Sequence, residues 1–168
     1  MNCPDCGHDN MAGADHCDHC GQELMSVDVP RAKSGLQRCI METPLRDLNP
    51  VTAVTASPAE PVAAIIIRMR KQRQGSVLIV DHGRLVGIFT ERDIVNRLTG
   101  VKRDLDALPI STVMTRDPKA LREDDTLAFA LHRMSVGNYR HVPIATEGKP
   151  LRFISVRGVL AYLNQHAR

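Results

Sequence analysis

Four cysteines near the N-terminus have the residue type and spacing of metal ligands. They form two copies of a Cys-x-x-Cys-Gly pattern, residues 3–7 and 17–21, and ten residues separate the second cysteine from the third. Each pair places two thiolates on one side of a tight turn, and two such turns facing each other complete a tetrahedral set for zinc. The glycine lets the chain leave the turn at positive φ without a Cβ clash. The predicted metal ligands are Cys3, Cys6, Cys17 and Cys20.

The segment 1–24 is too short to build an apolar core, so bound metal has to provide the free energy that folds it. Zinc is the expected metal, and iron in a rubredoxin-like site is the alternative, because ligand type alone does not choose between them. Disulfides would leave Cys39 as an odd thiol outside the cell, and a redox Cys-x-x-Cys usually follows an apolar strand, which is absent here. Cys39 itself fits a small buried hydrophobe or an inert thiol. The segment resembles a short zinc ribbon.

A second group with binding chemistry lies where an expected strand passes into a helix, in the stretch 87–93, Gly-Ile-Phe-Thr-Glu-Arg-Asp. Thr90 is the expected N-cap, and Asp93 reaches the same side of the helix start. The same spacing also describes a capping box, in which the acid only accepts from a backbone N–H. Gly87 leaves room for a ligand near the backbone, and N–H groups at a helix start favour a phosphate. In that context Asp93 is predicted to accept hydrogen bonds from a vicinal diol, as acids do with ribose.

These residues belong to a unit that occurs twice. Gly83 and Gly148 lie 65 positions apart, and the same offset joins Ile79 to Ile144 and several other apolar pairs. A repeat of this size predicts two similar halves that pack against each other.

Each half shows the order β-α-β-β-α. The first is expected to hold strands at 51–56, 77–80 and 85–89 and helices at 61–73 and 90–98. Gly75 is expected to stop the first helix, and 81–83 is expected to form a hairpin turn. The second is expected to hold strands at 119–121, 141–145 and 152–154 and helices at 126–136 and 155–165. One such unit exposes the apolar face of its sheet, so the fold class is α+β, with two repeats packed sheet to sheet behind a metal-stapled ribbon.

Composition narrows the class of protein. Hydrophobic residues make up 43% of the 168 residues and aromatic residues only 3%, so the core must be aliphatic. A formal charge of +3 is too small to indicate nucleic acid by itself. The longest apolar run, 62–67, is far shorter than a membrane span, and a cytoplasmic location is expected. No nucleophile elbow, Walker loop or HExxH motif is present, so no catalysis is expected.

Residues 38–165 resemble a tandem pair of cystathionine-β-synthase (CBS) domains, a Bateman module. The resemblance rests on the repeat, on the element order and on the Gly-h-h-Thr-x-x-Asp stretch ending at Asp93, where h is apolar. Further support comes from Met114-Thr115, from 138–144 as the second-strand motif, and from 154–157 as the start of the last helix. The predicted domains are a ribbon at 1–24, a linker at 25–37, and CBS repeats at 38–102 and 103–168.

The resemblance implies the roles of individual residues. Thr90 would hold a phosphate and Asp93 a ribose, with Gly87 admitting the ligand. Arg140 and His141 would be phosphate neighbours, although a solvated strand end explains them equally well. The second half departs from the pattern, because Arg152 stands at the position of Gly87 and Gly158 at that of Asp93. Ser155 remains as a cap or phosphate donor, so one well-formed nucleotide site is expected.

The resemblance also implies a function. Such modules bind AMP, ADP, ATP, S-adenosylmethionine or dinucleotides and change the behaviour of an associated protein, and many form homodimers. The leading hypothesis is a regulatory adenine-nucleotide-binding protein with a protein partner. A second hypothesis is a nucleic-acid-binding protein that uses the ribbon, with the CBS pair as its sensor. A third is a metal or redox sensor built on the ribbon.

Overall fold

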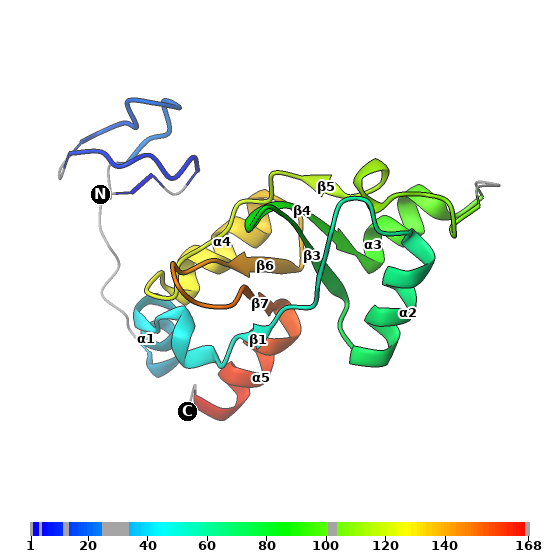
Figure 1. Ribbon diagram of the computed structural model, residues 1–168. Coiled ribbons are helices and arrows are strands. Elements are labelled where there is room, and N and C mark those ends of the chain that lie inside the picture. Colours follow the sequence, from blue (N-terminus) through cyan, green and yellow to red (C-terminus); the bar gives the residue numbers. More distant parts are fainter. Residues whose placement is uncertain (1, 4, 12–13, 25–33, 101–103, 167–168) are drawn as a thin grey trace. The chain divides into compact units, whose positions relative to one another are not determined.

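The computed structural model describes residues 2–3, 5–11, 14–24, 34–100 and 104–166 (Figure 1). These residues divide into two compact units. One contains Met1–Asn49, Glu123–Val142 and Ser155–Arg168, and the other contains Pro50–Arg122 and Pro143–Ile154. Most of the predicted linker and the predicted boundary between the repeats, at 102 and 103, lie outside the described residues. The domain boundaries therefore stay predictions.

The first CBS repeat forms a four-stranded sheet of order β2-β3-β4-β5. Its strands are β2 (Thr55–Ala56), β3 (Ser76–Asp81), β4 (Arg84–Thr90) and β5 (Thr115–Arg116). The β3–β4 hairpin turns at His82 and Gly83, both at positive φ, as a two-residue hairpin loop of type I′ requires. Both predicted strands and the predicted turn of this hairpin are confirmed.

Helix α2 (Val62–Gln72) covers one face of this sheet. Val62, Ile65 and Met69 recur at helical spacing and pack with Val77 and Ile79 of β3. The predicted helix at 61–73 is confirmed, but it ends in a left-handed residue, Arg73, and not at the glycine two positions later. The core of the unit also contains Ala56, Phe89, Ile110, Val113 and Met114.

The predicted helix at 90–98 has a different form. An α-helical turn, α3 (Glu91–Asp93), passes directly into a π-helical turn, Ile94–Leu98. Ile94 and Leu98 pack against the core of the first repeat.

The second repeat contributes strands and helices in the same order. Strands β6 (His141–Ile144) and β7 (Arg152–Ser155) belong to a three-stranded sheet of order β1-β7-β6, in which β1 is Val51–Thr52. The helices are α4 (Leu127–Val136), capped by Thr126, and α5 (Val156–His166). Helix α1 (Gly35–Glu42), which the sequence did not predict, lies beside α4 and α5, and a 3-10 turn, Leu45–Leu48, follows it.

The single strand predicted at 51–56 is wrong, because its two ends belong to different sheets. β1 pairs antiparallel with β7 of the second repeat, whereas β2 pairs parallel with β3 of the first. β5, near the start of the second repeat, pairs in turn with β4 of the first. The last strand of each repeat therefore pairs with a short strand near the start of the other repeat. The alternation of apolar residues within one short run cannot reveal such a pairing.

The predicted strand at 119–121 is reduced to a single bridge between Leu121 and Ile144. This bridge is parallel, like the pairing of Ala56 with Ile79 in the first repeat. Both residues of the bridge lie 65 positions after their counterparts, so the predicted offset is confirmed at the level of backbone pairing.

Candidate functional site

The four N-terminal cysteines come together. Their Sγ atoms all lie within 4.8 Å of one another, and Cys3–Cys20 and Cys6–Cys17 are each separated by 3.5 Å. The cluster of buried apolar residues in this segment consists of Cys3, Cys17 and Leu24, so the sulfur atoms themselves are much of its core. Four thiolates at this separation suit a tetrahedral thiophilic cation.

The two cysteine turns have the same construction. Gly7 N donates to Cys3 O and Gly21 N donates to Cys17 O, each at 2.9 Å, and the glycine φ angles are 75° and 73°. The glycines therefore have the conformation that the sequence predicted. Buried Asn10 joins the two turns, because its Oδ1 accepts from Asp18 N at 3.0 Å.

The neighbouring thiols also perturb one another. Burial alone would raise the pKa of Cys17. Hydrogen bonds from the backbone of Cys20 and His19 and from the Cys6 thiol together have the larger effect and lower this pKa to about 6. A backbone hydrogen bond from Gln22 lowers the pKa of Cys20, whereas burial and the other three thiols raise it, to about 12. One thiolate forms readily and further ionisation is opposed by like charge, so the full thiolate set requires a cation.

In the first CBS repeat, Thr90 and Asp93 form the capping box that their spacing allows. Asp93 N donates to Thr90 Oγ1 at 3.4 Å. In return, Asp93 Oδ2 accepts from Thr90 N at 2.9 Å and from Thr90 Oγ1 at 2.7 Å. Asp93 is only 7% exposed, so this carboxylate is held rigidly at the end of β4.

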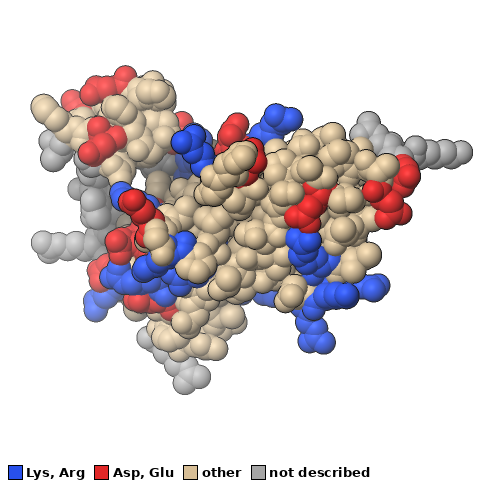
Figure 2. Space-filling model, in the orientation of Figure 1, with Lys and Arg blue, Asp and Glu red and all other residues tan. Residues whose placement is uncertain are grey.

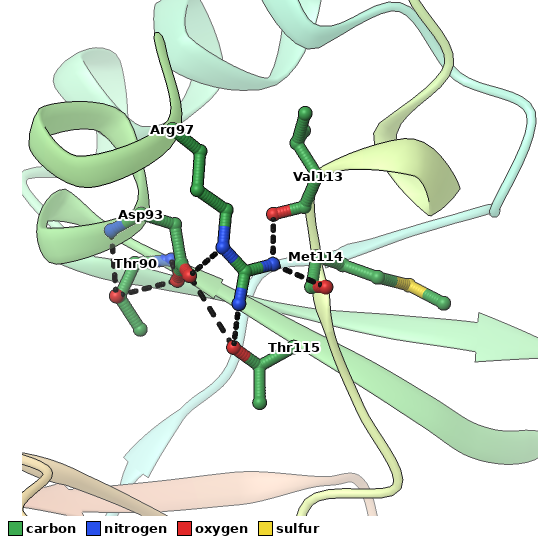
Figure 3. Close-up of polar contacts among 6 residues, drawn as sticks. All are labelled: Thr90, Asp93, Arg97, Val113, Met114 and Thr115. Carbon is green, nitrogen blue, oxygen red and sulfur yellow. Dashed lines mark hydrogen bonds and ion pairs between the residues drawn. The ribbon is translucent and has the colours of Figure 1, made fainter. Parts of the chain in front are cut away.

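The other carboxylate oxygen is joined to a distant segment. Asp93 Oδ1 accepts from Thr115 Oγ1 at 3.3 Å and lies 3.4 Å from Arg97 Nε (Figure 3). Sequence analysis did not single out Arg97. The sequence feature that could have predicted its role is its position four residues after Asp93 on the same helical stretch, because side chains at that spacing can form an ion pair.

Ser76 is a second residue that the sequence analysis missed. It is fully buried, lies opposite Thr90 in the β3–β4 pair, and its Oγ has no hydrogen-bond partner among the described residues. A buried hydroxyl without a partner is unfavourable, so a polar ligand group beside Thr90 would stabilise it.

The helix start differs from the expected anion site. Glu91 N donates to Gly75 O at 3.1 Å, and Asp93 N is taken by Thr90 Oγ1. Two of the amides expected to meet a phosphate are therefore already paired within the protein, and α3 is too short to add much dipole.

Gly87 lies on β4, as predicted, but the side chain of Met114 occupies the space above it. A Cβ at Gly87 would stand 2.3 Å from Met114 Sδ. Met114 is itself buried in the core of the first repeat. The glycine therefore has a packing role in this structure, and its role in admitting a ligand stays a prediction.

We expect Gly87→Ala to destabilise the protein by about 1–3 kcal/mol, because the added methyl group forces Met114 out of its position. Urea denaturation of Gly87→Ala, Met114→Ala and the double variant measures the free energy of unfolding. The double variant should lose less than the two single changes together. Gly158→Ala is the matched control, since its Cβ would meet nothing closer than 3.6 Å. Strict additivity would show that the two residues do not compete for space.

The predicted site residues of the second half lie at the ends of its strands and at the start of its last helix. Ser155 Oγ accepts from Gly158 N at 3.1 Å, so Ser155 begins α5 without the carboxylate that Asp93 provides in the first half. Arg152 is half-buried on β7, opposite Thr52. Arg140 is exposed and His141 half-buried at the start of β6. The role of these residues at a phosphate stays a prediction.

Comparison with known proteins identifies the family. The model of the CBS domain matches residues 39–100 and 110–165. The chain therefore belongs to the CBS-domain family, whose members are typically regulatory. The predicted tandem pair and the mixed α+β fold are confirmed.

Individual relatives support this assignment. An uncharacterised 17.7 kDa protein of Acidianus ambivalens is 33% identical over 129 residues, which cover 75% of this chain and 77% of that protein. The CBS domain-containing protein CBSCBSPB5 of Arabidopsis thaliana is 28% identical over 78% of this chain, but the match spans only 23% of the Arabidopsis protein. The CBS pair of protein MJ0100, solved with 5′-methylthioadenosine and S-adenosyl-L-methionine, has a TM-score of 0.63 at 24% identity, covering 72% of this chain and 99% of that chain.

Proposed function

We propose that this protein binds an adenine nucleotide or S-adenosylmethionine at the first CBS repeat and passes the binding state to a partner protein. The observation that carries the proposal is Asp93, a buried carboxylate fixed by Thr90 at the end of β4. Such a carboxylate can accept both hydroxyls of a ribose diol once one of its present partners leaves it.

The comparisons support this class of ligand. A CBS pair with the same fold was solved with two adenosine derivatives, and both carry the ribose diol that the Asp93 carboxylate suits. The resemblance to such modules also supports a homodimer. A regulatory role requires that the ligand bind two arrangements of the protein with different affinity.

We further propose that the four cysteines hold one structural zinc ion. Structural zinc sites are closed sets of four ligands, as here, and iron is the competitor because it accepts the same thiolate set. The ion would replace the missing apolar core of the ribbon.

The ribbon's charge argues against nucleic acid as its partner. Residues 1–24 contain five Asp and Glu and no Lys or Arg, so all 22 basic residues lie in the rest of the chain. Acidic side chains are visible on the ribbon at the upper left of Figure 2. Phosphate backbones require the opposite charge, and a basic protein surface suits this ribbon better. In the part of the chain that the structure describes, no helix has the length and apolar character to cross a membrane.

The test is calorimetric titration of the metal-loaded protein with AMP, ADP, ATP, S-adenosylmethionine and NAD. We expect saturable binding of at least one of these ligands with about one ligand per chain, because only the first repeat has the acid. Absence of binding by all five would overturn the proposal and leave Thr90 and Asp93 as a helix cap alone.

A further inference from the structure

The carboxylate of Asp93 has little capacity left for a ligand. An ionised carboxylate offers about four acceptor positions, two on each oxygen. Thr90 fills both positions on Oδ2 through its N–H and its hydroxyl. On Oδ1, Thr115 Oγ1 fills one position, and Arg97 Nε lies 3.4 Å away as an ion-pair partner. Three of the four positions are filled, so both hydroxyls of a diol can bind this carboxylate only if one of these groups leaves.

Arg97 ties Asp93 to the stretch that leads into the second repeat. Its Nη1 donates to Val113 O at 2.7 Å and to Met114 O at 2.6 Å, and its Nη2 donates to Thr115 Oγ1 at 3.2 Å. Figure 3 shows the guanidinium lying between the carboxylate and this stretch. Arg97 belongs to the π-helical turn, a rare form that is frequent at functional sites.

The two sides of the carboxylate differ in what their loss would disturb. The Oδ2 contacts cap the helix locally, within residues 90–93. The Oδ1 contact from Thr115 joins residues 22 positions apart and holds the start of β5, which pairs with β4 at only two positions. A ligand can therefore displace the groups bound to Oδ1 with a smaller loss of secondary structure than the groups bound to Oδ2.

We propose that Arg97 competes internally for Asp93, so that a ribose diol binds by displacing Arg97 and Thr115 from Oδ1. This inference rests on the proposed nucleotide site. Displacement loosens the stretch 113–116 from β4, and ligand occupancy then reaches the second repeat through the chain itself. Because coupling is reciprocal, weakening the tether must strengthen binding by the same factor. Arg97 is thus a positioning residue that acts through Asp93.

The experiment compares the metal-loaded wild type with Arg97→Met, which keeps an unbranched, flexible side chain but removes the charge and every donor. Calorimetry measures AMP and 2′-deoxy-AMP affinity, and amide hydrogen exchange follows Asp117 N–H, which donates to Val86 O beside β5. In the wild type, AMP should accelerate exchange at Asp117. In Arg97→Met, exchange should already be fast without AMP, and AMP should bind about 5-fold tighter or more.

Two further variants distinguish the effect of losing a positive charge from the effect of releasing the 113–116 stretch from Arg97. Arg70→Met removes the same charge from the exposed face of α2 and should change neither quantity. Arg97→Lys keeps an ion pair but lacks the fork that reaches two carbonyls, so its AMP affinity should fall between those of wild type and Arg97→Met.

The outcomes distinguish the two proposals. Equal AMP affinity and equal Asp117 exchange in wild type and Arg97→Met would overturn the displacement mechanism while the nucleotide site stands. Weaker AMP binding by Arg97→Met would also overturn it. Binding by Arg97→Met alone would support both proposals. No binding of AMP, ATP or S-adenosylmethionine by either protein would overturn the nucleotide site and the mechanism with it.

Discussion

Cys17→Ser is expected to unfold the ribbon at 1–24 while the CBS pair stays folded. Cys17 is buried, and its sulfur forms part of the small cluster that serves as the ribbon's core. Structural zinc contributes on the order of 10 kcal/mol or more to the folding of comparable peptides. The ribbon has no apolar core that could replace this contribution. The CBS pair stays folded, because the core of its first repeat is built from other residues.

Metal analysis and amide NMR spectra check this expectation. The wild type should hold about one metal ion per chain and show dispersed signals for the ribbon, and both should be lost in Cys17→Ser and after treatment with a strong chelator. Zinc and iron are distinguished by elemental analysis of the same sample. Acidification should also release the ion, because thiolates must take up protons as the pH falls.

Cys39→Ser is the matched control. Cys39 lies on α1, outside the cysteine cluster, and its Sγ accepts a weak hydrogen bond from Thr43 Oγ1 at 3.7 Å. The metal content of the Cys39→Ser variant should equal that of the wild type. A ribbon that stays ordered in Cys17→Ser without metal would show that the apolar contacts of Leu24 and its neighbours are sufficient, and the structural-metal proposal would fail.

Local patterns predicted the fold well where one segment determines its own structure. The helix at 61–73 and the 81–83 turn followed from apolar spacing and from residues that tolerate positive φ. The prediction failed for 51–56, where neighbouring residues pair with strands far away in the sequence. Strands of two residues carry too few side chains for an alternation pattern to assign their partners.

The same distinction applies to the candidate site. The cysteine cluster and the Thr90–Asp93 box depend on short spacings, and the structure contains both. The occupants of the neighbouring space, Met114 above Gly87 and Arg97 beside Asp93, depend on where β5 returns to β4. A sequence motif identifies the groups that can bind a ligand, but the groups that compete with the ligand come from the tertiary structure.

Asp93→Asn is expected to weaken AMP binding by about 10–100-fold, which corresponds to hydrogen bonds from ribose hydroxyls to a charged acceptor. Asparagine keeps the shape of the side chain, and its oxygen can still accept from Thr90 N. The cap is therefore retained in part, and we expect the free energy of unfolding to fall by only about 1 kcal/mol. Calorimetry and urea denaturation measure the two effects separately.

The comparison of AMP with 2′-deoxy-AMP shows whether the diol is the group that Asp93 recognises. The wild type should prefer AMP by about the same factor that Asp93→Asn loses, and the variant should bind the two nucleotides almost equally. Gly158→Asp supplies the complementary control, because it restores the acid after Ser155 and leaves Arg152 in place. If the variant retains the preference for AMP, Asp93 does not contact the diol. If Gly158→Asp gains a second binding site, the acid alone limits the second repeat and Arg152 is no barrier.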